Sequence, residues 1–462
     1  MTVLPNSPHA RDIKNVLHPY SNLVKHEEKG PLILDEGEGI YVKDTEGKSY
    51  IEGLAGLWCT SLGFKNERLV EAAAAQMRKL PYYHSFFHRS SMPAIDLAER
   101  LIAMAPAPMS KVWFANSGSE ANDHMVKFVW YYNNALGRPD KKKIIARIGG
   151  YHGIAVSSGS LTGMPLMHKG FDLPIKNIMH TGSPHHYRFA EPGESEEDFA
   201  TRRANELEQM ILDEGPETVA AFVAEPIMGA GGVILPPKTY FEKIQAVLKK
   251  YDVLMVADEV ICGFHRTGNL FGCNTYNIKP DIMVVAKQLS SAYLPISATI
   301  INEKVYQPIR DFSDENGVFA TGFTYSGHPV PAAVAIETLK IYEEMDIASH
   351  VRKVSPVAME RLAKLGDHPL VGEARGTGLI GAVELVKDKE TKENFGPEVA
   401  SYCGEACQKH GLILRAAAGN SVAFCPPLII KEDEIHMLFD RWEKALDDTL
   451  AYVQSENLMA AE

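Results

Sequence analysis

Short apolar runs alternate with amphipathic segments through the middle of the chain. The apolar runs have the length of buried strands, whereas in the segment 240–251 Phe241, Ile244 and Val247 fall on one helical stripe. Alternation of this kind predicts an α/β fold, with a mostly parallel central sheet and helices on both faces. The strands are predicted at 112–115, 143–147, 219–224, 253–257, 282–286 and 298–301, and a further helix at 206–212.

The pattern changes at about residue 331. A long helix is predicted over 332–344, and shorter mixed elements follow it, among them GLIGAVELV and GLILRA. Strand-like pieces, IYVKD and SYIEG, also occur close to the N-terminus. We therefore predict three parts: an N-terminal segment, 1–60, that packs with the small domain; a large domain, 61–330; and a small C-terminal domain, 331–462.

Composition and charge narrow the possible functions of this 462-residue chain. A net charge of -12 argues against a nucleic-acid or anionic-membrane partner, because phosphate groups are bound by basic surfaces. Neither a secretory signal nor a transmembrane helix is expected. The six cysteines form no CxxC pair, so no metal site is expected, and free thiols fit a reducing cytoplasm.

Three charged residues follow three successive predicted strands: Glu225, Asp258 and Lys287. The carboxyl ends of parallel strands meet at one edge of a sheet, which is where such folds bind ligands. An apolar setting such as the run before Lys287 favours the neutral amine, which attacks carbonyls and forms Schiff bases. The three side chains therefore predict a polar site that contains a nucleophilic lysine.

Pyridoxal phosphate is the cofactor suited to such a lysine. Its ring nitrogen needs a carboxylate, for which Asp258 is suited, and its ring needs a flat partner, for which Tyr151 is suited. Its phosphate needs N–H groups at the start of a helix, where the sequence places Ser117, Gly118 and Ser119. Each assignment alone has an ordinary alternative: a common loop, a core tyrosine or a capping aspartate. The combination is more specific than its members.

Long segments of the chain resemble class III aminotransferases of pyridoxal-phosphate fold type I. The resemblance rests on VADEVICGFHRTGNLFG, PDIMVVAKQLSSAYLPISAT, VWFANSGSEAN, GGYHG, AEPIMGAGGV and GFTYSGHP. It implies a large domain with a central sheet, and a smaller α+β domain built from the N- and C-terminal segments. Trp58, the segment LPYYHSFF and Arg415 are similar to the ω-transaminase branch, the amine:pyruvate and β-alanine:pyruvate group, over the ornithine and γ-aminobutyrate branches.

The resemblance implies a role for each site residue. Lys287 would form the Schiff base with the cofactor and move the proton, and Asp258 would keep the ring nitrogen protonated. The other cofactor contacts would be Tyr151 on one face of the ring, Val260 behind it, Glu225 near Asp258, and Ser117, Gly118 and Ser119 at the phosphate. Enzymes of this family are dimers, or dimers of dimers, with sites at the interface, so Thr324 would reach the partner's phosphate.

The resemblance also implies a substrate class. Trp58, Phe86 and Tyr151 would line an aromatic pocket for apolar amines, while Arg415 would bind the carboxylate of a keto acid. The expected reaction is ping-pong transfer of an amino group from a primary amine or ω-amino acid to a keto acid such as pyruvate, with S preference.

Three positions depart from the family pattern. Gln288, Ala292 and His265 stand where glycine is usual, which adds bulk near the chemistry.

Three alternative functions were compared with aminotransfer. Another fold type I reaction, such as that of an aminomutase or a decarboxylase, remains open. A nicotinamide enzyme lacks the expected GxGxxG motif. A non-catalytic relative would not need to retain Lys287 and Asp258 together.

Overall fold

The computed structural model describes residues 6–459, and a seven-stranded sheet forms its centre. The strand order is β4-β10-β9-β8-β7-β5-β6; β5 to β9 pair in parallel, and β10 runs antiparallel to both of its neighbours. The predicted α/β fold with a mostly parallel sheet is confirmed. The strands of this sheet are β4 (Lys111–Ala115), β5 (Lys143–Arg147), β6 (Ile178–Thr181), β7 (Val219–Ala224), β8 (Leu254–Asp258), β9 (Ile282–Val285) and β10 (Ser297–Ile301).

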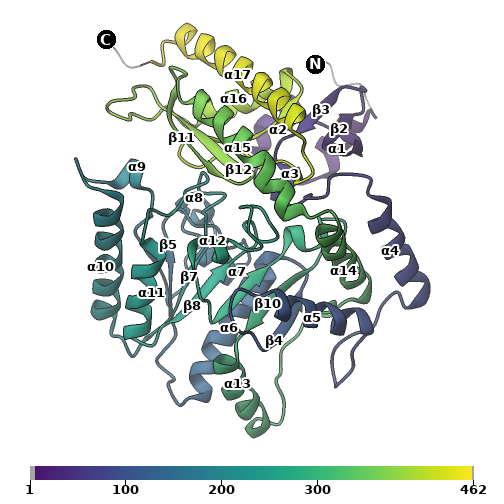
Figure 1. The fold of residues 1–462 in the computed structure, drawn as a ribbon, viewed down its shortest axis with the longest axis vertical. Coiled ribbons are helices and arrows are strands. Elements are labelled where there is room, and N and C mark those ends of the chain that lie inside the picture. Colours follow the sequence, from purple (N-terminus) through teal and green to yellow (C-terminus); the bar gives the residue numbers. More distant parts are fainter. Residues whose placement is uncertain (1–5, 460–462) are drawn as a thin grey trace.

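Helices cover the central sheet on both faces (Figure 1). Every residue of β7 is buried, as expected for a strand covered on both sides. Helix α11 turns Phe241, Ile244 and Leu248 inward, close to the stripe that the sequence predicts. The helices from the N-terminus to this region are α1 (Pro8–Asn15), α2 (Leu23–Lys29), α3 (Ala55–Trp58), α4 (Glu67–Lys79), α5 (Met92–Met104), α6 (Gly118–Ala135), α7 (Val156–Leu161), α8 (Pro165–His168), α9 (His186–Phe189), α10 (Glu196–Glu214), α11 (Tyr240–Lys250) and α12 (Gly272–Tyr276).

Two smaller sheets lie beside the central one, at the top of Figure 1. One combines β1 (Leu34–Glu38), β2 (Tyr41–Asp44) and β3 (Ser49–Glu52) with β13 (Leu412–Ile413). The other contains β11 (Val371–Thr377), β12 (Ile380–Leu385), β15 (Ser421–Phe424) and β14 (Arg415–Ala417). The parallel pairing of β3 with β13 joins the first strands of the chain to its last third.

The remaining helices divide between the two regions. Helix α14 packs on α4, α5 and the short 3₁₀ helix η1, whereas α15 packs on β11 and α17. These elements are η1 (Lys287–Ser290), α13 (Glu303–Glu315), α14 (Pro329–Glu344), α15 (Ile347–Leu365), α16 (Pro397–Lys409) and α17 (Glu432–Ser455). The domain boundaries at 60 and 330 stay predictions. Over residues 6–459, no helix combines the length and the apolarity that a membrane crossing requires.

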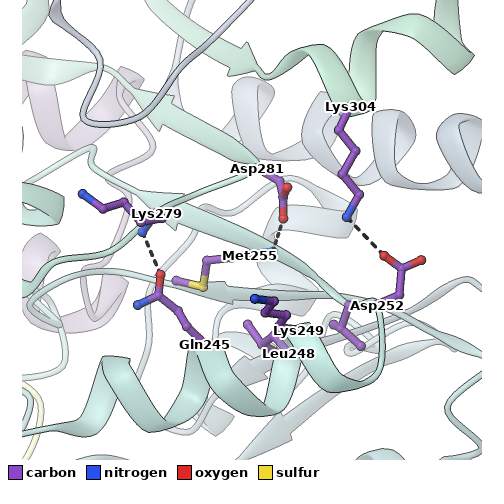
Figure 2. Close-up of a pocket in the computed structure, with 9 residues that line it drawn as sticks. Gln245, Leu248, Lys249, Asp252, Met255, Lys279, Asp281 and Lys304 are labelled. Atoms are coloured by element: carbon purple, nitrogen blue, oxygen red, sulfur yellow. Dashed lines mark hydrogen bonds and ion pairs between the residues drawn. The ribbon is translucent and has the colours of Figure 1, made fainter.

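A small cavity lies at the amino ends of β8 and β9 (Figure 2). Its volume is about 330 Å³, and charged side chains border it. Asp281 accepts a hydrogen bond from the Met255 amide at 3.0 Å, and Lys304 pairs with Asp252 at 3.1 Å. These contacts join strand starts to neighbouring segments. The cavity therefore lies at the sheet edge opposite the strand ends that carry Asp258 and Lys287.

Candidate active site

The structure brings Glu225, Asp258 and Lys287 to one edge of the central sheet. Strands β7, β8 and β9 are adjacent and parallel, with Ala224 opposite Ala257 and Asp258 opposite Val284. Glu225 follows β7, Asp258 ends β8, and Lys287 opens η1, which one residue separates from β9. The polar cluster predicted from the strand ends is therefore present as a geometric arrangement.

Lys287 occupies a strained and apolar position. Its backbone has a φ of 49°, in the left-handed region that few residues other than glycine adopt. Burial lowers the pKa of Lys287, against the opposing effect of nearby Cys59 and Asp258. Within residues 6–459, no acceptor forms a hydrogen bond or ion pair with its ammonium group. The amine is therefore suited to attack a carbonyl carbon.

Asp258 is buried but well supplied with hydrogen-bond donors. Its Oδ2 lies 2.8 Å from His152 Nδ1 and accepts from Asn122 Nδ2 at 2.9 Å, while Oδ1 accepts from the Val260 amide at 3.1 Å. Burial alone would raise the pKa of Asp258, but the contacts with His152 and Asn122 outweigh burial and lower it. The group is therefore an ionised carboxylate held in one orientation.

Glu225 organises the backbone beside Asp258. Its Oε1 accepts from the Tyr151 amide at 2.9 Å, and its Oε2 accepts from the Gly229 amide at 3.0 Å. Arg147 donates to the Glu225 carbonyl at 2.5 Å. Burial raises the pKa of Glu225. The side chain thus fixes the segment that presents Tyr151 to the site.

The start of helix α6 offers free donors for a phosphate. Ser117 is the N-cap, and its Oγ accepts from the Glu120 amide at 3.2 Å. The amides of Gly118 and Ser119 have no acceptor among the residues that the structure describes. A Cβ on Gly118 would lie 3.3 Å from both methyl groups of Val260, so only glycine leaves this space open. Unpaired amides, a buried carboxylate and an unpaired amine together fit pyridoxal phosphate.

Tyr20, a residue without a role in the sequence analysis, connects two of the predicted site residues. Its hydroxyl donates to the Tyr151 hydroxyl at 3.3 Å, and the Arg415 guanidinium carbon lies 6.0 Å from the centre of its ring. Burial, followed by this contact with Tyr20, raises the pKa of Tyr151. The N-terminal segment therefore contributes to the rim of the site.

His152 and Asn122 were also missed as functional residues, although both lie within quoted motifs. His152 is the fourth residue of GGYHG, and Asn122 is the last residue of NSGSEAN. Only the fold places them against Asp258, from segments 106 and 136 residues away. Their membership of these motifs could have indicated a function for His152 and Asn122. Tyr20 lies in no such motif, so nothing in the sequence pointed to it.

The remaining predicted substrate residues fall into two groups. Trp58 is 1% exposed and belongs to an apolar cluster with Leu54 and Ile261. Phe86 instead lies against Gly322, on the exposed segment of Thr324, whose carbonyl accepts from Tyr82 at 2.8 Å. Phe86 therefore lies against the segment that contains Thr324. The predicted roles of Phe86 in the substrate pocket and of Thr324 at the partner's phosphate stay predictions.

The three departures from glycine have distinct local settings. His265 and Ala292 have φ angles of 75° and 61°, which glycine adopts without strain. Gln288 is buried, and its amide donates to the Ile261 carbonyl at 2.8 Å. Its bulk is therefore held against the segment that follows β8.

Comparison with known proteins agrees with this geometry. The family model described as Aminotransferase class-III matches residues 23–446. A gamma aminobutyrate transaminase 3, chloroplastic, from Solanum lycopersicum is 52% identical over 97% of this chain and 88% of its own length. A probable gamma-aminobutyrate transaminase 2, mitochondrial, from Oryza sativa subsp. indica is 54% identical over 91% of this chain and 85% of its own length.

A solved structure is similar throughout. The omega transaminase from Pseudomonas jessenii in complex with PMP has a TM-score of 0.96 and 57% identity, and the match covers 97% of this chain and 99% of that one. The chain therefore belongs to the class III aminotransferases, enzymes of fold type I that transfer amino groups with pyridoxal phosphate.

Proposed function

We propose that this aminotransferase takes the amino group of a primary amine or an ω-amino acid and passes it to pyruvate in a ping-pong reaction. The observation that carries the proposal is the placement of Lys287 and Asp258 at one sheet edge, beside the chain of contacts from Tyr151 through Tyr20 to Arg415. It combines a nucleophilic amine with a positive charge suited to a carboxylate substrate.

The chemical roles follow from the environment of each side chain. When bound, pyridoxal phosphate supplies an aldehyde carbon and a ring that accepts electrons. Lys287 would bind that carbon and, once freed by the amine substrate, carry the proton between substrate and cofactor. Asp258 would hold a proton on the ring nitrogen, and Tyr151 and Val260 would contact the two faces of the ring. Ser117, Gly118 and Ser119 would donate to the phosphate.

Arg415 supports the choice of a keto acid as acceptor. It is half-buried on β14, and no carboxylate within residues 6–459 pairs with its guanidinium group. A bidentate arginine–carboxylate pair is strong and geometrically specific. The small residues that follow, Ala416 to Gly419, would allow this strand to move. We propose that Arg415 binds pyruvate in one half-reaction and withdraws for apolar amines in the other.

The relatives favour one ω-amino acid. Several of them are named gamma aminobutyrate transaminases. γ-Aminobutyrate has a terminal amine for Lys287 chemistry and a carboxylate for Arg415. We therefore include it, with β-alanine and arylalkyl amines, among the proposed donors, with S preference where the donor is chiral.

We further propose a homodimer, or a dimer of such dimers, in which Thr324 and Phe86 complete the partner's site. Exposed aromatic residues support this surface, because Phe87 is 77% and Tyr325 59% exposed. For location we propose the cytoplasm, on the basis of six unpaired cysteines within residues 6–459. Relatives named chloroplastic or mitochondrial make organelles the alternative.

A coupled assay tests the substrate proposal. Purified enzyme with cofactor is given one of three donors, γ-aminobutyrate, β-alanine or (S)-1-phenylethylamine, together with pyruvate or, in parallel reactions, with a different keto acid. Formation of alanine together with the aldehyde or ketone of the donor is the expected result. If keto acids other than pyruvate support turnover and pyruvate does not, the acceptor assignment fails. Release of carbon dioxide without alanine would instead indicate a decarboxylase.

A further inference from the structure

Two histidines and an aspartate converge in the N-terminal segment, away from the strand-end cluster. His18 Nε2 lies 2.8 Å and His26 Nε2 3.2 Å from the same oxygen, Oδ1 of Asp12. The two imidazole rings lie one over the other, with centroids 4.0 Å apart and planes tilted by 31°. The three potential ligand atoms all lie within 4.8 Å of one another. Two imidazole nitrogens and a carboxylate oxygen therefore form one compact group of potential ligand atoms.

These spacings suit a transition-metal ion. Zinc takes nitrogen and oxygen ligands at about 2.0–2.2 Å in tetrahedral geometry, which separates neighbouring ligand atoms by about 3.3 Å. The observed separations of 2.8 and 3.2 Å need only a small opening to admit an ion. The side chains of His18, His26 and Asp12 are 26%, 11% and 22% exposed, so water can reach a fourth position.

A second group of potential ligand atoms differs from the first because an arginine already pairs with its carboxylates. His185, Glu373 and Glu384 also bring three ligand atoms together. There, however, Arg375 lies 2.5 Å from Glu373 and 2.7 Å from Glu384. A guanidinium group at that distance already neutralises the carboxylates and would repel a metal ion. In the N-terminal cluster, no lysine or arginine within residues 6–459 pairs with Asp12.

The ligands come from three separate pieces of the segment. Asp12 lies in α1, His26 lies in α2, and His18 lies in the turn between these helices. Tyr20 is in the same turn, two residues after His18, and donates to the Tyr151 hydroxyl. An ion bound by all three side chains would cross-link both helices and fix this turn.

We propose that Asp12, His18 and His26 form a binding site for a divalent transition-metal ion of the zinc type, which holds the Tyr20 turn against the active site. The binding site itself does not depend on the proposed substrates, and the effect on Tyr20 rests on the proposed function. Zinc is preferred because two imidazoles and one carboxylate match its ligand chemistry.

Metal titration of the chelator-treated holoenzyme tests the site. Calorimetry with Zn²⁺ is expected to give one ion per chain, and Co²⁺ is expected to give visible absorption bands of a low-symmetry site. H18Q, H26Q and D12N should each weaken Zn²⁺ binding at least about tenfold. H9Q removes a neighbouring histidine of α1 and should leave binding unchanged. Unchanged binding in H18Q and H26Q, or absence of binding to the wild type, overturns the proposal.

Two further readouts separate binding from folding and from turnover. The circular dichroism spectra of the three ligand variants should match that of the wild type, which shows that weaker binding does not result from misfolding. If a histidine variant misfolds, D12N, the most conservative substitution, decides whether the side chains bind the ion. Saturating Zn²⁺ should slow proteolysis within residues 8–29 of the wild type but not of H18Q. A metal-dependent protection that persists in H18Q contradicts the cross-link. Neither measurement requires amine turnover, so the metal-site proposal can be tested even if the substrate proposal fails.

Discussion

At the scale of single residues, burial acts in opposite directions on the two central groups. Lys287 lacks a partner within residues 6–459, so burial lowers its pKa and favours the neutral amine. Asp258 is buried, but His152 and Asn122 contact its carboxylate, and its pKa falls below the usual range. The surroundings therefore favour the neutral form of the amine and the ionised form of the carboxylate. The sequence predicted both residues but not the partners that set their charge.

Removal of the lysine amine is the most direct test at this scale. Lys287→Ala should lower alanine formation by at least about 10²- to 10⁴-fold, the usual contribution of positioned proton transfer. It should also remove the absorption of the Schiff base formed with added cofactor. Lys279→Ala, at the opposite edge of the sheet, is the matched control and should retain activity. Amine turnover at the wild-type rate in Lys287→Ala would refute the assignment.

His152 should control the acid limb of activity through Asp258. The wild-type pKa of Asp258 lies below its usual range, so this carboxylate stays ionised until the pH falls through that low value. His152→Ala removes the contact that favours the ionised form most, so the pKa of Asp258 should rise. The pH–rate profile should then lose activity on its acid side at a higher pH than the wild type. His436→Ala, at an exposed histidine of α17, should not shift the profile.

At the scale of elements, six of the seven central strands were predictable, whereas the turns around them and β6 were not, because β6 is a short edge strand that is only partly buried. Buried apolar runs located β5 and β7 to the residue, because such runs are short and sharply bounded. They did not reveal that β10 is antiparallel, because a buried strand has the same pattern in either direction. The positive φ angles at Lys287 and Ser291 also escaped prediction, because glycine, their usual signal, is absent there, whereas Ala292 was recognised as a position where glycine is usual.

Ala292 should store a small amount of strain. Its φ of 61° costs an alanine about 1–2 kcal/mol, whereas glycine loses about 0.5–1 kcal/mol in chain entropy on folding. Ala292→Gly should therefore raise the free energy of unfolding by about 0.5 kcal/mol, as measured by urea denaturation. Ala75→Gly, at an exposed position of α4, should lower it by about 0.5–1 kcal/mol. Destabilisation by both substitutions would contradict strain at Ala292.

Glu259 should make the junction of β8 and α12 sensitive to pH. It accepts from the amides of Gly272 and Cys273, and burial raises its pKa to about 7. The folded state therefore binds this proton more tightly than the unfolded state, so stability from this group falls as pH rises from about 4.5 to about 7. The difference in melting temperature between the wild type and Glu259→Gln should shift against the wild type over that range. The difference between the wild type and Glu71→Gln, a substitution at an exposed position, should stay constant.

At the scale of the whole molecule, the site draws on segments from both ends of the chain. Tyr20 comes from the N-terminal segment and donates to Tyr151, which lies in the loop after β5 of the central sheet, and Arg415 of β14 lies near the ring of Tyr20. The resemblance to known families supplied Arg415, whereas Tyr20 lies in a short exposed turn without hydrophobic periodicity. Such a turn leaves no pattern in the sequence, because its position depends on contacts with distant segments. The substrate rim was therefore only partly predictable.

The proposed dimer completes the site through the surface that contains Phe86 and Thr324. Phe87, 77% exposed on this surface, is a suitable probe, because a charge buried at the centre of an interface costs at least about 2 kcal/mol, or about thirtyfold in the dissociation constant. Phe87→Asp should weaken dimerisation by that factor in sedimentation equilibrium, and activity should fall with dilution. Phe171→Asp, at a residue 73% exposed on another segment, should leave both unchanged. Equal dissociation constants for both variants would place the interface elsewhere, and Thr324 would then not reach a partner's phosphate through this surface.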